Sequence, residues 1–446
     1  MGIGLGVARR VATLCSLPKT LLGTRLYANA FYLWANTMLA TAAGFIFWIV
    51  AARIYRAHDV GLAAAAVASL MLLGAVANLG LGLALIRFLA EAGARRVRLL
   101  NGSFTLASLA AAAMAMVFLA GIPLWSPSLG FLREQPLTFG LYTVFAISYA
   151  LRPIQTQAFV AMRRPELDLL ATLGGAVTKL GLLMLLAVFL VPFGIVSASA
   201  AAPLAGLTMG FLWLLRRAEP TYRPAVILRG GPGPEMLSYS FGNYVSKLLL
   251  MTPDLIVPLV VLNRLGGEAS AYFYVAWAME SVVETVSVSL SLSLFAEGSH
   301  YPDRLRATLW RSLRGGILVS ALAALVFLVA ADKLLLVFGA DYAREGANLL
   351  RLLALGAVPA CVTNIYVGVE QARKGIRRLV LVSTVVAAIT LGASYWLLGA
   401  VGLEGAGIAW LAAQCAGAGL AAGLYFLERR RSQGESLPGS SRLAGE

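Results

Sequence analysis

The stretch 241-FGNYVSKLLLMTPDLIVPLVVLNRLGGEASAYFYVAWAMESVVETVSVSLSLSL-294 consists of two long apolar runs joined by a short turn at residues 263–267. The two runs carry four charged side chains, Lys247, Asp254, Glu280 and Glu284. Lys247 and Asp254 are seven residues apart, so they share one face of a helix. A charge at the middle of a bilayer costs roughly 2.5–3.5 kcal/mol on insertion scales, so such residues face protein or a water-filled cavity. The stretch therefore predicts two membrane helices beside an internal polar path.

The composition indicates a helical membrane protein. Of the 446 residues, 59% are hydrophobic and 13% are charged, whereas soluble domains carry about 25% charged residues. The apolar runs are about 20 residues long, which is the length of a membrane-spanning α-helix rather than of a barrel strand. About twelve such segments are predicted, at residues 29–52, 61–86, 101–125, 138–161, 167–191, 194–215, 240–262, 269–295, 315–331, 347–370, 379–399 and 405–427.

The basic residues orient these segments. With the N-terminus in the cytoplasm, 26 of the 36 Lys and Arg residues fall in cytoplasmic segments, seven fall in outer segments and three lie within helices. Basic loops stay on the cytoplasmic side, so both termini are expected there. The net charge of +15 then reflects topology and contact with anionic membrane lipids rather than binding to nucleic acid.

A linker divides the chain into two halves of six helices. Residues 216–238 form the longest internal connection, with four Pro residues and the pair Gly230-Gly231. Because six is even, the second half enters the membrane in the same orientation as the first. This predicts a parallel pseudo-two-fold repeat with a substrate site between the halves. The predicted divisions are a cytoplasmic N-terminal segment at 1–26, an N-lobe at 27–215, the linker at 216–238, a C-lobe at 239–427 and a disordered cytoplasmic tail at 428–446.

The sequence offers no recognisable set of residues for metal binding or covalent catalysis. The three Cys and two His residues are scattered, so we expect no zinc cluster and no cofactor. We find no nucleophile–base pair and no phosphate-cradling loop, and the predicted outer loops are short. We therefore expect that the protein is not an enzyme.

Several short motifs follow one another in a characteristic order. The first half contains WIVAARIY at 48–55, then Asp59-Val60-Gly61, then LGLG at 79–82 running to Ile86-Arg87-Phe88. The second half contains FGADY at 338–342, LRLL at 350–353 and GLEGAGIAW at 402–410. In this order, over about residues 27–427, the chain resembles the polysaccharide and O-antigen flippases of the multidrug/oligosaccharidyl-lipid/polysaccharide exporter superfamily.

The resemblance implies a V-shaped fold of two lobes around a central cavity, working by alternating access. It implies that a lipid-linked oligosaccharide, usually on polyprenyl pyrophosphate, moves from the inner to the outer leaflet. The product would serve the synthesis of cell-surface polysaccharide such as the O-antigen of lipopolysaccharide. It also implies a multi-pass protein of the inner (cytoplasmic) membrane that works as a monomer.

A flippase needs cations for phosphate and polar groups for sugar hydroxyls inside the membrane. The in-membrane cations are Arg152, Lys179 and Lys247, and Arg87 at the inner end of the second segment is a fourth candidate. Arg can bind phosphate through two parallel donors, and Lys provides a compact charge. The alternatives are that Lys247 pairs with Asp254, and that Arg87 only marks the cytoplasmic side.

Four polar residues are predicted to line the same cavity. Asn29, Tyr32 and Asn36 form a stripe on the first helix, and Gln155 shares a face with Arg152. These side chains face either the sugar or a neighbouring helix, and the sequence does not distinguish the two.

Three acids are candidates for ion coupling. Asp254, Glu280 and Glu284 can bind a proton or a sodium ion, and two carboxylates four residues apart repel each other when both are ionised. The alternative is that they form salt bridges with Lys179 or Lys247.

Three functions compete. The first is the flippase, and the second is a multidrug exporter driven by an ion gradient, whose cavity charge would be mainly acidic to hold cationic drugs. The third is a membrane enzyme acting on polyprenyl-phosphate saccharides. The mixture of cations and acids in the central helices favours the flippase, and the short outer loops disfavour the enzyme.

Overall fold

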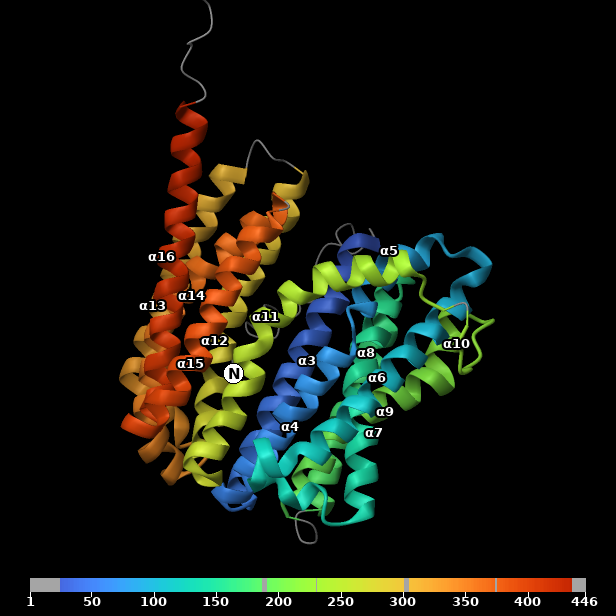
Figure 1. The fold of residues 1–446 in the computed structure, drawn as a ribbon, viewed down its shortest axis with the longest axis horizontal. Coiled ribbons are helices and arrows are strands. Elements are labelled where there is room, and N and C mark those ends of the chain that lie inside the picture. The colour runs from blue at the N-terminus through green and yellow to red at the C-terminus, as the bar shows by residue number, and fades with distance from the viewer. Residues whose placement is uncertain (1–24, 187–190, 230, 301–304, 374, 435–446) are drawn as a thin grey trace, which may run out of the picture. The chain divides into compact units, whose positions relative to one another are not determined.

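The computed structural model describes residues 25–186, 191–229, 231–300, 305–373 and 375–434 (Figure 1). Every regular element in these residues is a helix. The first half contains α3 (Arg25–Ile54), α4 (Ala57–Ala77), α5 (Leu81–Glu91), η1 (Gly93–Arg95), α6 (Arg96–Trp125), η2 (Pro127–Leu132), α7 (Pro136–Ala161), α8 (Pro165–Leu186), α9 (Phe193–Met209), η3 (Gly210–Leu214) and α10 (Leu215–Ala218). The second half contains α11 (Pro234–Leu265), α12 (Gly267–His300), α13 (Leu305–Leu335), α14 (Ala340–Ala372), α15 (Ile376–Val401) and α16 (Glu404–Gly434).

Eleven helices in the described part of the chain are long and apolar enough to cross a membrane. The predicted all-α membrane class is therefore confirmed. The predicted segment 269–295 is helical as well, because it lies within α12. This helix, which carries Glu280, Glu284 and a series of serines, is not one of the eleven found in the described part of the chain.

The LGLG motif marks a break between two helices rather than the continuous helix predicted over 61–86. Leu79 and Gly80 have positive φ angles of 53° and 71°, in the left-handed region that ends an α-helix. Asn78 donates a hydrogen bond from its side-chain amide to the Ala150 carbonyl of α7, at 3.2 Å. The break is therefore held against the neighbouring helix.

The described residues divide into two compact units. Unit 1 contains the described residues through Trp48, Leu73–Gly121 and Phe131–Gly242. Unit 2 contains Ile49–Leu72, Ile122–Gly130 and the described residues from Asn243 onward. The C-terminal end of α3 and most of α4 thus pack with the second half of the chain.

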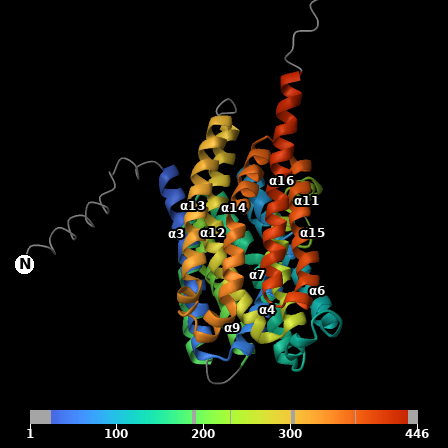
Figure 2. The same cartoon turned by 90° about the vertical axis from the view of Figure 1, so that its left-hand side faces the viewer.

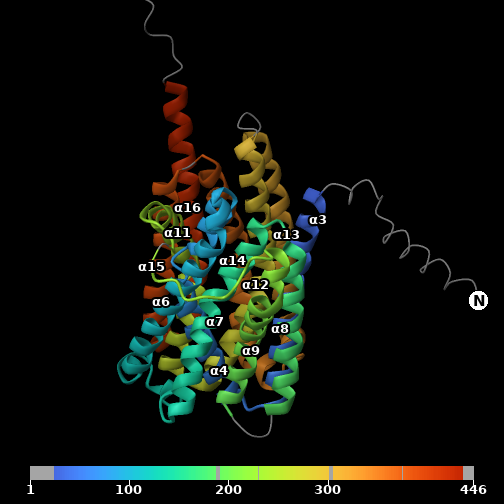
Figure 3. The same ribbon diagram turned by 90° about the vertical axis from the view of Figure 1, so that its right-hand side faces the viewer.

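Unit 1 is a bundle in which α7 contacts α5, α8 and α9 (Figure 3). Its core includes Leu85, Phe104, Ile154 and Phe159, all at most 5% exposed. The linker after α10 lies along α6, where Asn101 donates from its side-chain amide to the Arg223 carbonyl at 2.7 Å. The predicted linker is therefore fixed to one unit over part of its length.

Unit 2 is a second bundle, in which α14 packs against α12, α13 and α16 (Figure 2). The WIVAARIY and FGADY motifs meet here. Arg53 donates from its guanidinium to the carbonyls of Leu336 and Val337, at 2.6 and 2.9 Å. These carbonyls follow the end of α13, so Arg53 supplies hydrogen bonds that a helix end otherwise lacks.

Close backbone approach fixes the contact between α4 and α12 in unit 2. A Cβ at Gly61 would collide with the Gly267 carbonyl, and Ser270 donates from its hydroxyl to the Gly61 carbonyl at 3.3 Å. Small residues allow membrane helices to approach in this way.

We expect Gly61→Ala to destabilise the protein by about 1–3 kcal/mol, because the added methyl group has no space. The matched control is Gly140→Ala in α7, where a Cβ meets no atom within 4 Å. Alanine has a higher helix propensity than glycine, so this control variant should be at least as stable as the wild type. Thermal unfolding of the purified proteins tests this, and equal melting temperatures for the two variants would contradict the packing argument.

Candidate functional site

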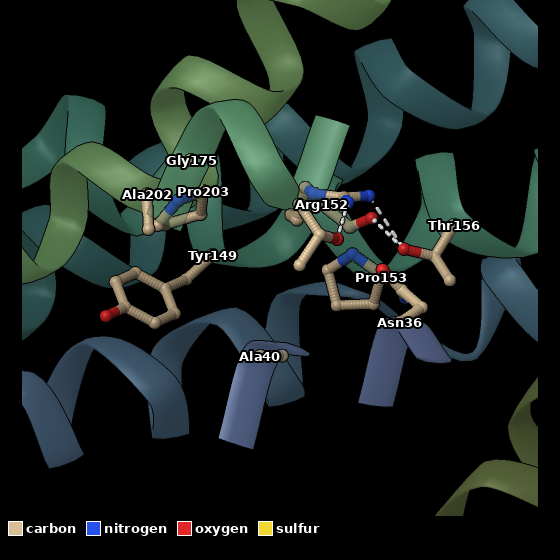
Figure 4. Close-up of a pocket in the computed structure, with 10 residues that line it drawn as sticks. Asn36, Ala40, Tyr149, Arg152, Pro153, Thr156, Gly175, Ala202 and Pro203 are labelled. Carbon is tan, nitrogen blue, oxygen red and sulfur yellow. Dashed lines mark hydrogen bonds between the residues drawn. The ribbon is translucent and has the colours of Figure 1, made fainter. Parts of the chain in front are cut away.

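A cavity lined by apolar and polar side chains lies within unit 1, between α3, α7, α8 and α9 (Figure 4). Its volume is about 310 Å³. Apolar and small residues form part of the wall, and polar side chains form the rest. The lining residues are Asn36, Ala40, Tyr149, Arg152, Pro153, Thr156, Thr172, Gly175, Ala202 and Pro203.

A buried ion pair forms the polar wall of this cavity. Arg152 Nη1 lies 2.6 Å from Asp168 Oδ1, and the Asp168 side chain is 1% exposed. The other terminal nitrogen of Arg152 donates to the Thr172 hydroxyl at 2.9 Å. Thr156 also donates to Asp168 Oδ1, at 3.1 Å. The charge on Arg152 is thus neutralised by α8 and shared with two hydroxyl groups.

Asn36 connects α3 to this network. Its Nδ2 atom donates to Asp168 Oδ2 at 2.9 Å. Its other side-chain atom, Oδ1, is buried and has no hydrogen-bond partner among the described residues. Asn36, which lines the cavity, therefore has one engaged donor and one buried acceptor that no described residue satisfies.

Small residues on α8 and α9 create the space for the arginine. A Cβ at Gly206 would lie 2.9 Å from Arg152 Nε, and a Cβ at Gly175 would lie 2.5 Å from the Ala202 carbonyl oxygen. Side chains at either position would force the helices apart or displace the guanidinium. The cavity thus depends on two close approaches that only glycine permits.

Lys179 lies further along α8 on the face that carries Thr172 and Gly175. Its Nζ atom sits 4.2 Å from the centre of the Phe47 ring on α3, in a cation–π contact. No ion pair to Lys179 is formed by any residue that the structure describes. Asn36 of α3 contacts Asp168 of α8, and Phe47 of α3 contacts Lys179 of α8. On both helices the second contact lies eleven residues after the first. The two helices therefore run in parallel with a matched register.

The other predicted cavity residues lie elsewhere in unit 1. Gln155 is fully buried, and its amide donates to the Gly206 carbonyl at 3.4 Å. Asn29 and Tyr32 are half-buried on α3 and do not line the cavity. Arg87 is exposed on α5, with its guanidinium 5.6 Å from the centre of the Phe88 ring. The structure thus brings Asn36 and Arg152 together and leaves these four residues apart from them.

The fourth predicted cation, Lys247, belongs to α11 of unit 2. Its side chain lies outside the described residues.

The three acids of the central stretch interact with one another in unit 2. Glu280 is 1% exposed, and neither of its carboxylate oxygens has a hydrogen-bond partner in the described residues. Asp254 and Glu284 both act on it electrostatically. Trp277 donates a hydrogen bond to Asp254. Like charges this close repel, so the cluster favours the uptake of a positive charge.

Asn364 joins this cluster from α14. Its side-chain amide donates to Glu284 Oε1 at 3.4 Å and to the Ser287 hydroxyl at 3.1 Å. Of the described residues, no group of three or more His, Cys, Asp and Glu is arranged to hold a metal ion. The acids therefore form a hydrogen-bonded and electrostatic cluster rather than a metal centre of that kind.

Asp168 and Asn364 are functional candidates that the sequence reasoning missed. Asp168 begins a helix beside Arg163 and Arg164, where an acid is ordinarily solvated. A signal for it was present, because Asp168 is four residues before Thr172 and eleven before Lys179, on one helical face. Asn364 carries no comparable signal within its apolar segment.

Residues 26–295 match the family described as polysaccharide biosynthesis protein. The chain belongs to this family. The family covers more than half of the sequence, including α3, the whole cavity network of unit 1 and the acids of α12. Among curated proteins, no sequence matches the chain closely enough to assign a relative.

Solved structures similar to this chain include a flippase and multidrug transporters. The lipid II flippase MurJ, in an inward closed conformation, has a TM-score of 0.72 and 13% identity, covering 90% of this chain and 87% of its own. A multidrug resistance MATE family transporter of the MOP superfamily, inward-facing, has a TM-score of 0.67 and 15% identity, covering 88% and 96%. The outward-facing transporter has a TM-score of 0.61 and 14% identity, covering 94% and 99%.

These similarities show that the chain has the two-lobe fold of the MOP superfamily. The resemblance found in the sequence motifs predicted this fold. This member of the polysaccharide biosynthesis family is a multi-pass membrane protein. The similar solved structures named above are a flippase and a multidrug transporter.

The Arg152–Asp168 pair can be tested by a double-mutant cycle. Arg152→Gln and Asp168→Asn each leave one buried charge without its partner, so each should cost about 3–5 kcal/mol of stability. The double variant removes both charges and should be more stable than either single variant. Chemical or thermal unfolding in one detergent measures all four proteins. Additive losses in the double variant would show that the two side chains do not form a pair in solution.

Proposed function

We propose that the protein is a flippase that moves a lipid-linked (polyprenyl-pyrophosphate) oligosaccharide from the cytoplasmic to the outer leaflet by alternating access, for cell-surface polysaccharide synthesis. The observation that carries the proposal is the cavity between four helices of unit 1, with polar side chains on one part of its wall, in a chain of the polysaccharide biosynthesis family. A saccharide with many hydroxyl groups needs hydrogen-bonding side chains in place of water. The cavity offers an amide, two threonine hydroxyls and a guanidinium.

Lys179 is the cation that best suits the pyrophosphate. It is partly buried on a membrane-length helix, and its ammonium contacts a ring rather than a carboxylate. A compact ammonium is a good partner for phosphate oxygens. In this proposal Lys247 and Arg87 add positive charge along the route of the headgroup, and Arg152 takes part through its network with Asp168.

The proposed setting is the inner (cytoplasmic) membrane, with both termini in the cytoplasm and the protein acting as a monomer. The distribution of Lys and Arg supports this orientation, since 26 of the 36 fall in the segments assigned to the cytoplasm. Those residues would also contact anionic lipids.

Coupling to an ion gradient is assigned in this proposal to the acids of unit 2. Glu280 has no hydrogen-bond partner among the described residues and lies near two other carboxylates, so binding of a proton or sodium ion would relieve their repulsion. The acids lie on α11 and α12, and Asn364 links them to α14. Binding of an ion would thus change the contacts between helices.

The same acids support the second candidate function, a multidrug exporter driven by an ion gradient. A cluster of carboxylates without a described counter-charge also suits a cationic drug. The two functions differ in the sign of the transported charge, so matched anionic and cationic substrates separate them.

We expect Lys179→Ala to reduce flipping of a fluorescent polyprenyl-pyrophosphate oligosaccharide in reconstituted vesicles at least tenfold, by removing the ammonium that binds phosphate. The control is Lys333→Ala, which removes an exposed lysine at the end of α13. The measurement is the fraction of substrate that reaches the opposite leaflet. Normal flipping by Lys179→Ala would remove this lysine from the mechanism, and transport of cationic dyes alone would favour the exporter.

The combined change Glu280→Gln and Glu284→Gln should remove the dependence of transport on an imposed proton or sodium gradient. Glutamine keeps the size of each side chain and loses its charge. Transport is followed in vesicles with and without each gradient, and Thr285→Val, at the exposed position directly after Glu284, is the control. An unchanged response to both gradients would assign the acids a structural role.

A further inference from the structure

We infer that the cavity of unit 1 binds an uncharged sugar ring, and that Asp168 sets this specificity by neutralising Arg152. The inference rests on the proposed function, and it names which part of the lipid-linked saccharide each region of unit 1 recognises. It separates two chemistries that the sequence analysis had combined, namely phosphate binding and sugar binding.

The Arg152–Asp168 ion pair favours an uncharged ligand. The guanidinium of Arg152 already binds a carboxylate, with 2.6 Å between Nη1 and Asp168 Oδ1. Its second terminal nitrogen is engaged by the Thr172 hydroxyl. A pyrophosphate entering the cavity would therefore meet a neutral pair, and it would have to displace Asp168 to gain a bidentate contact. An uncharged ligand meets no such competitor.

Asn36 has an acceptor, unsatisfied among the described residues, that suits a hydroxyl group. Only Nδ2 of this amide can donate to Asp168 Oδ2, so the orientation of the amide is fixed by its partner. The carbonyl oxygen Oδ1 is then left buried without a partner in the described residues. An ionised phosphate has only acceptor oxygens and cannot satisfy it. A sugar hydroxyl donates and accepts, so it can satisfy Oδ1 and also accept from a neighbouring donor.

The size and form of the cavity suit a single sugar ring. Its volume of about 310 Å³ is at the lower end of the range for small-molecule sites, which suits one ring rather than a chain. Tyr149, Ala202 and Pro203 lie on one side, and Arg152, Thr156 and Asn36 lie on the other (Figure 4). A sugar ring has the same two-sided character, with an apolar C–H face and polar hydroxyl edges.

Lys179 lies where it can hold a pyrophosphate next to a bound sugar. It lies seven residues after Thr172 on one face of α8, about 10 Å along the helix. In a polyprenyl-pyrophosphate saccharide the first sugar is joined directly to the pyrophosphate. A pyrophosphate at Lys179 would thus place the attached sugar towards the cavity.

The test measures binding to the full-length protein in lipid nanodiscs. The neutral probes are geranyl glycosides of glucose, galactose and N-acetylglucosamine, and the charged probe is geranyl pyrophosphate. We expect Asn36→Ala to lower the affinity for the best-binding glycoside by about fivefold, which corresponds to the loss of one hydrogen bond. The affinity for geranyl pyrophosphate should not change. The control is Thr37→Ala, because Thr37 is exposed and donates only to the Leu33 carbonyl of its own helix, at 3.1 Å.

A gain of affinity gives the second readout. Asp168→Asn frees the charge of Arg152, so this variant should bind geranyl pyrophosphate about tenfold more tightly than the wild type, and the ligand should raise its melting temperature more. Lys179→Ala should weaken the binding of geranyl pyrophosphate and leave the affinity for the glycosides unchanged. If Asp168→Asn does not fold, the Asn36→Ala comparison decides alone.

Three results would overturn the inference. These are the absence of binding by all three glycosides, equal glycoside affinity for Asn36→Ala and wild type, and equal weakening of glycosides and geranyl pyrophosphate in Asn36→Ala. Failure of the flippase proposal is a separate result. Glycoside binding that depends on Asn36, in a protein that flips no lipid-linked saccharide, would keep the sugar site and reject the transport function.

Discussion

Burial of a charge inside a bundle of membrane-length helices constrains unit 1 more than any other interaction, because an unpaired ion there would be neutralised or expelled. Arg152 and Asp168 meet this constraint by pairing across α7 and α8 at 2.6 Å. The pair fixes the register of α8, and through Asn36 it fixes the register of α3. Gly175 and Gly206 then allow α9 to close around it. The cavity is what remains between four helices that this network holds together.

Unit 2 handles its buried charge differently. Glu280, Glu284 and Asp254 have the same sign, and among the described residues they are stabilised by an amide and an indole rather than by a cation. A paired site such as Arg152–Asp168 is stable as it stands. A cluster of like charges gains stability when it binds a positive charge. This contrast is why we assign substrate recognition to unit 1 and ion coupling to unit 2.

Most of the helices could be predicted from the sequence, because an apolar run of about 20 residues is typical of a membrane-spanning helix. The sequence also located Arg152 and Asn36, since a charge or amide within such a run stands out. It did not reveal that Asp168 would bind both, because contacts between α3, α7 and α8 depend on tertiary packing. The break at Leu79-Gly80 was missed for a related reason. Its apolar residues continue the helical pattern, and only the backbone angles show the turn.

Contacts within unit 2 give a physical reason for two of the sequence motifs. Arg53 belongs to the motif at 48–55, and its guanidinium binds the two carbonyls directly before the motif at 338–342. Gly61 follows the first motif, and it touches Gly267 where α12 begins. The two halves of the chain are therefore joined by residues that each look ordinary alone. A short motif with arginine or glycine in a membrane protein can thus form a structural contact with a distant segment rather than bind a substrate.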